Sequence, residues 1–125
     1  MRLLLDTQLY LWFLADSPRL SKKARTKIAG AEEVYISAGS IWESSIKAAI
    51  GKLDVADDDL VAGIEASGFV ELPILARHAA LVATLPPHHR DPFDRLLIAQ
   101  AIHEPMHLLT ADRQLKQYSD LVELV

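Results

Sequence analysis

The chain has 125 residues, half of them hydrophobic, which is enough apolar material for one globular domain over residues 1–125 with a buried core. It contains no cysteine, which excludes disulfides, zinc–thiolate sites and cysteine nucleophiles and is compatible with a reducing cytoplasm, the location we expect. The formal net charge of -4 at pH 7 excludes a bulk basic surface, so any contacts with nucleic acid phosphates must be local or bridged by a metal ion.

At the N-terminus the apolar run Leu3–Leu5 is ended by Asp6, which predicts a short buried strand rather than a signal peptide or a membrane span. Further strands are expected at short apolar runs, namely Val34–Ile36, Phe69–Pro73, His107–Thr110 and, as an edge strand, Leu121–Val125. Helices are expected between them, at Leu9–Leu14, Ser21–Gly30, Ile41–Ile50, Asp57–Ser67, Ala76–Leu85, Pro92–His103 and after Asp112. This alternation predicts a three-layer α/β fold, in which a small, mostly parallel sheet of about four or five strands is flanked by helices.

The stretch from His88 to Ala101 is predicted to begin a helix with two acidic residues at its start. Asp91 suits the N-cap, Pro92 suits the first helical position, and Asp94 then lies in the first turn. Apolar residues recur at helical spacing from Phe93 onward, which predicts that one face of the helix is buried. Acids in a first turn complement the helix dipole, but a rigid helix start also holds a metal-binding carboxylate steady.

Four acidic residues from distant parts of the sequence are predicted to meet at one edge of this sheet. They are Asp6 after the first strand, Glu43 on the helix after the second, Asp94 on the helix before the fourth, and Asp112 after the fourth. Ligands of such folds bind beyond the carboxyl ends of the strands, so this edge is where we expect a site. Clustered carboxylates repel one another unless a cation neutralises them, and oxygen ligands alone favour Mg²⁺ or Mn²⁺. A water bound to such an ion can attack a phosphodiester.

Each of these acids also has a structural explanation that the sequence leaves open. Asp6 and Asp112 can each cap the helix that follows. The segment from Ser40 to Glu43 fits a capping box, in which a serine and a glutamate satisfy backbone groups at a helix start. The histidines are weaker candidates, and we expect His88 and His89 to be solvated loop residues rather than ligands.

Several short segments of this sequence match one known family, in order and along nearly the whole chain. The most specific of them are the Asp-Pro-Phe-Asp-Arg run of residues 91–95 and the helix that carries Trp42 and Glu43. The other matching segments are Leu3–Thr7, Ile36–Ser40, Gly51–Leu53, Leu72–Ile74, Leu85–Arg90 and Leu108–Asp112. With these segments the chain resembles the PIN-domain proteins of the VapC-type toxin group.

The resemblance implies a PIN-like fold and a Mg²⁺-dependent endoribonuclease, in which Mn²⁺ can substitute, acting as the toxin of a type II toxin–antitoxin system. It also implies a homodimer, inhibited by a small antitoxin protein that itself binds DNA. By position, four residues match the acids of the family, namely Asp6, Glu43, Asp94 and Asp112. Asp91 is an alternative match for the third acid, and Thr7 and Thr110 match small hydroxyl positions beside the site.

The resemblance further implies that Asp6, Asp94 and Asp112 hold one or two Mg²⁺ ions and that Glu43 orients or deprotonates the attacking water. Cleavage would leave 5′-phosphate and 3′-hydroxyl ends on the RNA. Many relatives have a histidine where this chain has Gln8, and glutamine cannot titrate near neutral pH, which argues against a role of this position in proton transfer. We expect the RNA to be held by scattered cations such as Lys47, Arg90, Arg95 and Arg113, although for any one of them taken singly an ordinary solvated charge is the preferred explanation.

Two other functions remain to be separated by experiment. A receiver-like phosphotransfer domain would carry an acidic pair ahead of its first helix, whereas Asp6 stands alone here. A catalytically inactive PIN-like binding module would use the same acids only to dock a basic segment of a partner. In addition, the side chains of Trp12, Phe13, Trp42 and Ile46 are expected to form either an apolar cleft for an antitoxin helix or part of the core.

Overall fold

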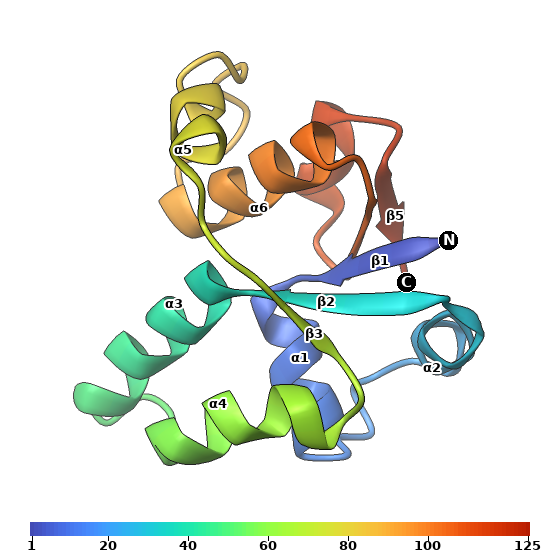
Figure 1. The fold of residues 1–125 in the computed structure, drawn as a ribbon, viewed down its shortest axis with the longest axis vertical. Helices are drawn as coiled ribbons and strands as arrows, with labels where there is room; N and C mark the ends of the chain where they lie inside the picture. Colours follow the sequence, from blue (N-terminus) through green and yellow to red (C-terminus); the bar gives the residue numbers. More distant parts are fainter.

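The computed structural model describes residues 1–125 and contains one sheet in which every pair of neighbouring strands is parallel. The strands are β1 (Arg2–Leu5), β2 (Glu33–Ser37), β3 (Val70–Leu72), β4 (His107–Thr110) and β5 (Val122–Leu124). Their spatial order is β3-β2-β1-β4-β5, so β1 is central and β5 is an edge strand (Figure 1). This arrangement confirms the predicted parallel α/β fold.

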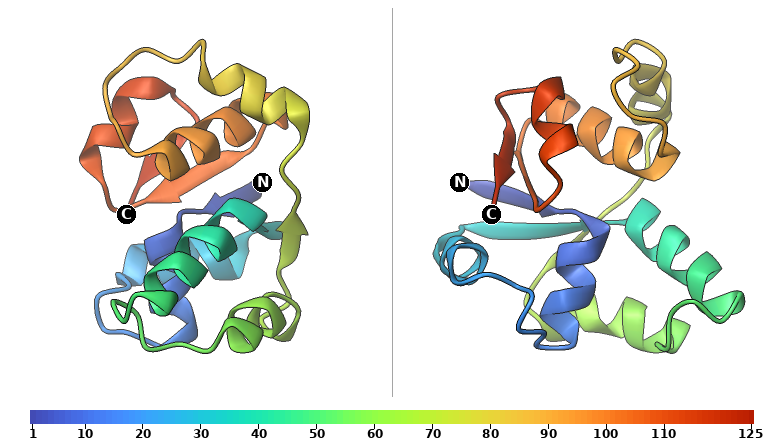
Figure 2. Two further views of the ribbon diagram at one scale, coloured as in Figure 1. Left: turned by 90° about the vertical axis from the view of Figure 1, so that its left-hand side faces the viewer. Right: turned by 180° about the vertical axis from the view of Figure 1, so that it is seen from behind.

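Helices cover both faces of the sheet and complete the three layers. They are α1 (Thr7–Leu14), α2 (Lys22–Gly30), α3 (Ala38–Ala49), α4 (Asp57–Ala66), α5 (Ala76–Val82), α6 (Pro92–His103) and the 3-10 helix η1 (Arg113–Tyr118). In Figure 2, α5, α6 and η1 lie on one side of the sheet and α1, α2 and α4 lie on the other. No helix has the length and apolar character needed to cross a membrane.

Strand β1 requires an unbroken apolar run because both of its faces are buried. The side chains of Leu3 and Leu5 belong to the core cluster that α1, α2 and α4 share with the sheet. The side chain of Leu4 points to the opposite face and joins the cluster formed with α6, η1 and β5. All three leucines have no exposed surface. Successive side chains of a strand face opposite ways, which explains why both faces of β1 need leucines. Asp6 is the first residue after the strand ends, so it lies at the rim of the sheet, between two faces that helices cover.

Helix α3 begins at Ala38, three residues before the predicted start at Ile41, and this corrects the expected capping box. The N-cap is Ser37, whose Oγ accepts a hydrogen bond from the backbone N–H of Gly39 at 2.9 Å. Strand β2 therefore runs into α3 without the expected loop. Glu43 lies in the second turn rather than at the helix start, so the prediction that it closes a capping box with Ser40 is wrong.

Helix α6 is buried on nearly every side rather than on one face as predicted. Six consecutive residues, from Leu96 to Ala101, are buried. The helix packs against β4 and η1 and is covered from outside by α5 and by the start of α3. Helix α5 itself ends at Val82 rather than at the predicted Leu85. The periodicity of α6 could not reveal this burial because it depends on two neighbouring helices.

The four apolar residues for which the sequence left open a cleft or a place in the core differ in their exposure. Trp12 and Phe13 pack against the core cluster beneath the sheet, and Phe13 contacts Phe69 with ring centroids 4.8 Å apart. Trp42 and Ile46 are instead 59% and 42% exposed on α3. Trp12 and Phe13 therefore agree with the core alternative, whereas the exposure of Trp42 and Ile46 does not.

The close approach of α3 to α6 can be tested at Gly39. A Cβ atom at this position would lie 2.9 Å from Leu96 Cδ2 and 3.2 Å from Ser37 Oγ. We expect Gly39→Ala to lower the free energy of unfolding by about 1–3 kcal/mol, measured by urea denaturation, because the buried side chains must shift. The matched control is Gly30→Ala in α2, where no atom lies within 4 Å of the added methyl group. The control should keep or slightly raise the stability, and equal stability of both variants would contradict this packing.

Candidate active site

A cavity of about 180 Å³ opens at the carboxyl ends of β1 and β4 and is lined by eight residues, none of them hydrophobic. The lining consists of Asp6, Thr7, Gln8, Glu43, Lys47, Asp91, Asp94 and Asp112. The structure thus brings the four predicted acids together in one cavity, and the alternative third acid lies there with them. Of the two predicted hydroxyl residues, Thr7 lines the cavity and Thr110 lies behind Asp6.

Asp6 is held by hydrogen bonds to both of its carboxylate oxygens. Its Oδ1 accepts a bond from the backbone N–H of Leu9 at 2.8 Å, so Asp6 is the N-cap of α1. Its Oδ2 accepts a bond from Thr110 Oγ1, and that hydroxyl oxygen also accepts from the backbone N–H of Asp112 at 3.0 Å. On the other side, Thr7 Oγ1 donates to Ser40 Oγ at 2.9 Å and ties α1 to α3. Thr110 therefore orients the carboxylate of Asp6, and Thr7 holds the adjacent start of α1 against α3.

Glu43 projects from α3 into the cavity with one oxygen satisfied and one orphaned. Its side chain is 10% exposed, and Oε2 accepts from Lys47 Nζ at 3.0 Å. Its Oε1 is buried and has no hydrogen-bond partner. A buried polar atom without a partner is costly, so this oxygen indicates a place where a ligand, a water or an ion belongs.

Asp91 and Asp94 have different tasks at the start of α6. Asp91 Oδ1 accepts from the backbone N–H groups of Phe93 at 2.8 Å and Asp94 at 3.2 Å, so Asp91 is the N-cap, as predicted. Asp94 is not needed for capping, and its Oδ2 lies 3.0 Å from the Nε2 atom of His89. Because Asp91 caps the helix and Asp94 does not, Asp94 is favoured over Asp91 as the third acid of the site.

His89 belongs to the site, although the sequence indicated a solvated loop residue. Its Nε2 atom lies 3.0 Å from Asp94 Oδ2 and 3.9 Å from Asp112 Oδ2, and its side chain is 22% exposed. Asp112 meanwhile uses Oδ1 to cap η1, accepting from the backbone N–H of Gln114 at 2.9 Å. The neighbouring His88 points elsewhere and packs against the ring of Tyr118 with centroids 5.1 Å apart. No spacing in the sequence distinguishes the two histidines.

Burial and the neighbouring charges disfavour the ionised forms of Asp6 and Asp94. Desolvation raises the pKa of Asp6 to about 6, and the charges of Asp112 and Glu43 act in the same direction. Desolvation also raises the pKa of Asp94 to about 6, with a further contribution from the charge of Asp91, while the hydrogen bond to His89 opposes it. A divalent cation would relieve this repulsion. Carboxylate oxygens of this kind and the orphaned Glu43 oxygen together fit Mg²⁺ or a related ion.

The cations expected to contact RNA are placed unequally. The guanidinium of Arg95 makes its hydrogen bonds within the protein. It donates to the carbonyl groups of Val82, Leu85 and Pro86 at 2.9–3.3 Å and to the Tyr118 hydroxyl group at 3.2 Å. Lys47 lines the cavity but is paired with Glu43. Arg90 and Arg113 are exposed and form no salt bridge. Arg95 therefore has a structural role instead of the expected RNA contact.

Comparisons with known proteins agree with the resemblance seen in the sequence. A model of the PIN domain family matches residues 3–121. The chain is 30% identical over 121 residues to the ribonuclease VapC22 of Mycobacterium tuberculosis. The aligned region covers 92% of this chain and 90% of that protein. Its fold is similar to VapBC2 of Rickettsia felis, solved with a promoter DNA fragment, at a TM-score of 0.76 and 17% identity over 100% of this chain and 99% of that chain. It is also similar to a toxin–antitoxin complex of Klebsiella pneumoniae, at a TM-score of 0.67 and 15% identity over 96% and 94% of the two chains. At such identities the structural likenesses show the fold alone.

The raised pKa of Asp94 predicts how stability depends on pH when divalent ions are removed. The pKa is about 6 in the folded state against an ordinary value of 3.8, so between these values the folded state holds a proton that the unfolded state releases. Stability therefore falls as the pH rises through this interval and levels off above it. Asp94→Asn removes this penalty, and we expect it to raise the free energy of unfolding at pH 7.5 by on the order of 1–3 kcal/mol, with little change near pH 4.

The measurement is thermal or urea denaturation in EDTA at both pH values. Asp58→Asn, which replaces an exposed acid in the first turn of α4, serves as the control and should show no such pH dependence. A loss of stability in Asp94→Asn at pH 7.5 would mean that Asp94 acts mainly as a helix-start residue.

Proposed function

The chain belongs to the PIN domain family, as its sequence predicted, and on this basis we propose that it is a metal-dependent endoribonuclease and the toxin of a toxin–antitoxin pair. The observation that carries the proposal is the cavity itself, in which five carboxylates from four separate segments meet without a hydrophobic residue. Such a cluster is unfavourable for the apoprotein, so a ligand that compensates it is the simplest reason for its existence. The ribonuclease activity named for the Mycobacterium tuberculosis relative supports the substrate class.

We assign Asp6, Asp94 and Asp112 as the residues that would hold Mg²⁺, with Mn²⁺ as a substitute. When bound, the metal would neutralise charge on the scissile phosphate and lower the pKa of a water molecule. Glu43 Oε1 is the atom that would accept a proton from the attacking water, because it is free while Lys47 holds Oε2. The new bond joins the water oxygen to phosphorus and the P–O3′ bond breaks. The O3′ atom takes a proton from solvent, which leaves 5′-phosphate and 3′-hydroxyl ends.

We propose that RNA phosphates are contacted by Lys47, Arg90 and Arg113 rather than by a continuous basic face. All three are cations on the surface, with Lys47 at the cavity itself, and Arg95 is left out because its donors are used internally. Scattered contacts agree with the net charge of -4. Gln8 is exposed at the cavity rim, and a hydrogen bond to the substrate is the role that its amide group allows.

We further propose a protein antitoxin as the partner, together with self-association into a homodimer. The likeness to a solved toxin–antitoxin complex supports the first of these. The exposed side chains of Trp42, Ile46 and Ile50 occur at every fourth position of the α3 region and form an apolar stripe that favours contact with another protein surface.

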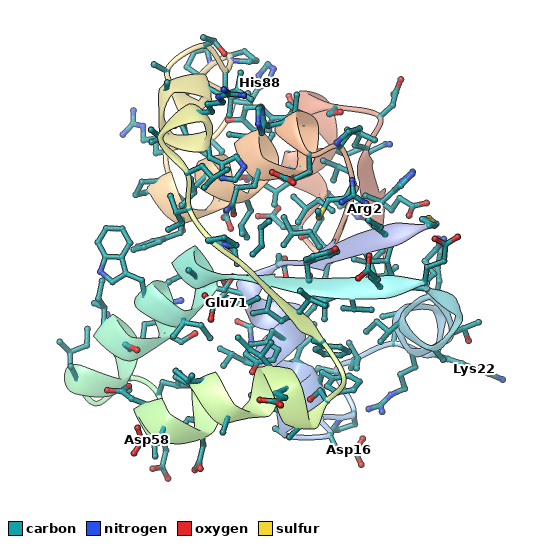
Figure 3. The ribbon with its side chains drawn as sticks, viewed as in Figure 1. Arg2, Asp16, Lys22, Asp58, Glu71 and His88 are labelled. Carbon is teal, nitrogen blue, oxygen red and sulfur yellow. The ribbon has the colours of Figure 1, made fainter.

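The activity is tested by incubating the purified chain with a structured, end-labelled RNA in Mg²⁺, in Mn²⁺ and in EDTA. We expect cleavage only with metal. We also expect Asp6→Asn and Glu43→Gln to lower the rate by about 100-fold or more, because each removes a charged oxygen next to the reacting phosphate. The matched control is Asp58→Asn, which should cleave like the wild type. Figure 3 shows Asp58 on α4, at the opposite end of the molecule from His88.

The same experiment separates the competing functions. RNA or a basic peptide that binds without cleavage, in protein that melts normally, would favour the inactive binding module. Transfer of phosphate from acetyl phosphate to Asp6 would favour the receiver-like alternative. Equal cleavage by Asp6→Asn and the wild type would contradict the assignment of the cavity as the active site.

A further inference from the structure

Two clusters in the structure combine histidine with carboxylate groups in the manner of a metal site. One consists of His78, His103 and Glu104, where α5 packs on α6, and the other consists of His89 with Asp94 and Asp112, the last two of which line the acidic cavity. In both clusters the ligand atoms lie within 4.8 Å of one another. Separation alone therefore does not distinguish them, but the hydrogen bonds of the Nδ1 atoms do: His78 Nδ1 has a backbone donor and His89 Nδ1 has no partner.

The cluster between α5 and α6 is not suited to a metal ion. His78 is fully buried, and its Nδ1 atom accepts a hydrogen bond from the backbone N–H of Leu75 at 3.0 Å. Nδ1 therefore carries the lone pair and Nε2 carries the proton, which it donates to Glu104 Oε2 at 2.7 Å. A metal at Nε2 would need the lone pair there, and the displaced proton on Nδ1 would face the N–H of Leu75. This cluster is a structural clamp between two helices.

His89 differs from His78 because its Nδ1 atom is not occupied by a hydrogen-bond donor. Its Nε2 atom faces Asp94 and Asp112, whereas its Nδ1 atom makes no hydrogen bond in the structure. Without a cation, Nε2–H donates to Asp94 Oδ2. Because Nδ1 has no partner, the ring proton can move to Nδ1 when a cation replaces the proton on Nε2, and the Nε2 lone pair is then free to bind that cation. The ligand atoms of His89, Asp94 and Asp112 lie within 4.8 Å of one another, so one cation would be within reach of all three.

A second observation independently indicates that this cavity takes a ligand. Glu43 lines the same cavity, its side chain is nine-tenths buried, and its Oε1 atom has no partner. The donor set around the cavity is then one imidazole nitrogen with several carboxylate oxygens. Oxygen donors alone suit Mg²⁺, whereas an imidazole nitrogen raises the affinity for transition ions much more than for Mg²⁺.

We propose that His89 Nε2 is a metal ligand together with Asp94 and Asp112, and that this mixed nitrogen–oxygen site binds Mn²⁺, Co²⁺ and Zn²⁺ more tightly than Mg²⁺. The proposal deepens the proposed function and rests on it, since it names the class of metal that the same cavity takes. It revises the expectation that only oxygen atoms ligate the ion. His89 is thereby assigned to metal binding, and Glu43 keeps its role toward the attacking water.

The test measures metal binding by the full chain without RNA. Calorimetric titrations with Mn²⁺ and Mg²⁺, and the visible absorption of bound Co²⁺, are compared for the wild type, His89→Gln and His88→Gln. We expect His89→Gln to weaken Mn²⁺ binding by about 10- to 100-fold and to change the Co²⁺ spectrum, with less than about a threefold change for Mg²⁺. His88→Gln should match the wild type, because His88 packs against Tyr118 outside the cavity.

A second measurement does not depend on how the variants fold. In wild-type protein titrated with Zn²⁺, the ring nitrogen shifts of His89 should show Nε2 ligated and Nδ1 protonated, while those of His78 stay unchanged. Unaltered His89 shifts, or Mn²⁺ binding within about twofold of the wild type in His89→Gln, would overturn the proposal. The proposed nuclease would still stand if Asp94→Asn lost Mg²⁺ binding. A wild-type chain that binds none of these ions would overturn both proposals.

Discussion

The burial of Asp6 at the end of the central strand is the constraint on which the rest of the site depends. Three leucines with no exposed surface precede it, and both faces of β1 are covered by helices, so the carboxyl group cannot move out to solvent without dislodging the strand. The chain meets this constraint with two hydrogen bonds, from Leu9 and from Thr110, yet burial still raises the pKa of Asp6 to about 6. A cation beside it would lower that pKa, which couples the stability of the fold to what the cavity binds.

The structural and chemical explanations of these acids are compatible, because a carboxylate has two oxygens. Asp112 uses Oδ1 as the cap of η1 and turns Oδ2 toward His89. Asp91 takes over the capping of α6, which leaves the Oδ2 atom of Asp94 to the cavity. Helix starts are rigid and carry partial positive charge, so they hold anionic groups in place more firmly than loops do. For Asp6 and Asp112, capping a helix and facing the cavity are thus compatible uses of one carboxylate.

The features that follow from local pattern were predictable from the sequence. The strand β4 at His107–Thr110, the N-caps Ser21, Asp91 and Asp112, and the parallel order of strands and helices depend on short-range propensities and hydrophobic runs. The convergence of the acids followed from topology, because strands that run in parallel end at one edge. The burial of α6 on nearly every side, the early start of α3 and the exposure of Trp42 depend on which helices become neighbours. Periodicity within one helix does not contain that information.

The two residues that sequence reasoning misplaced at the site, Arg95 and His89, are linked in the structure. The guanidinium of Arg95 donates to the carbonyls of Val82, Leu85 and Pro86, and so fixes the connection between α5 and α6 from inside. It also reaches the carbonyl of His89 at 3.5 Å and the hydroxyl group of Tyr118 at 3.2 Å. A loop held at this many points is fixed in place, and it carries His89, whose ring lies beside Asp94 and Asp112. The arginine that appeared in the sequence to be free for RNA therefore holds the backbone of the segment that carries the histidine that appeared to be solvated.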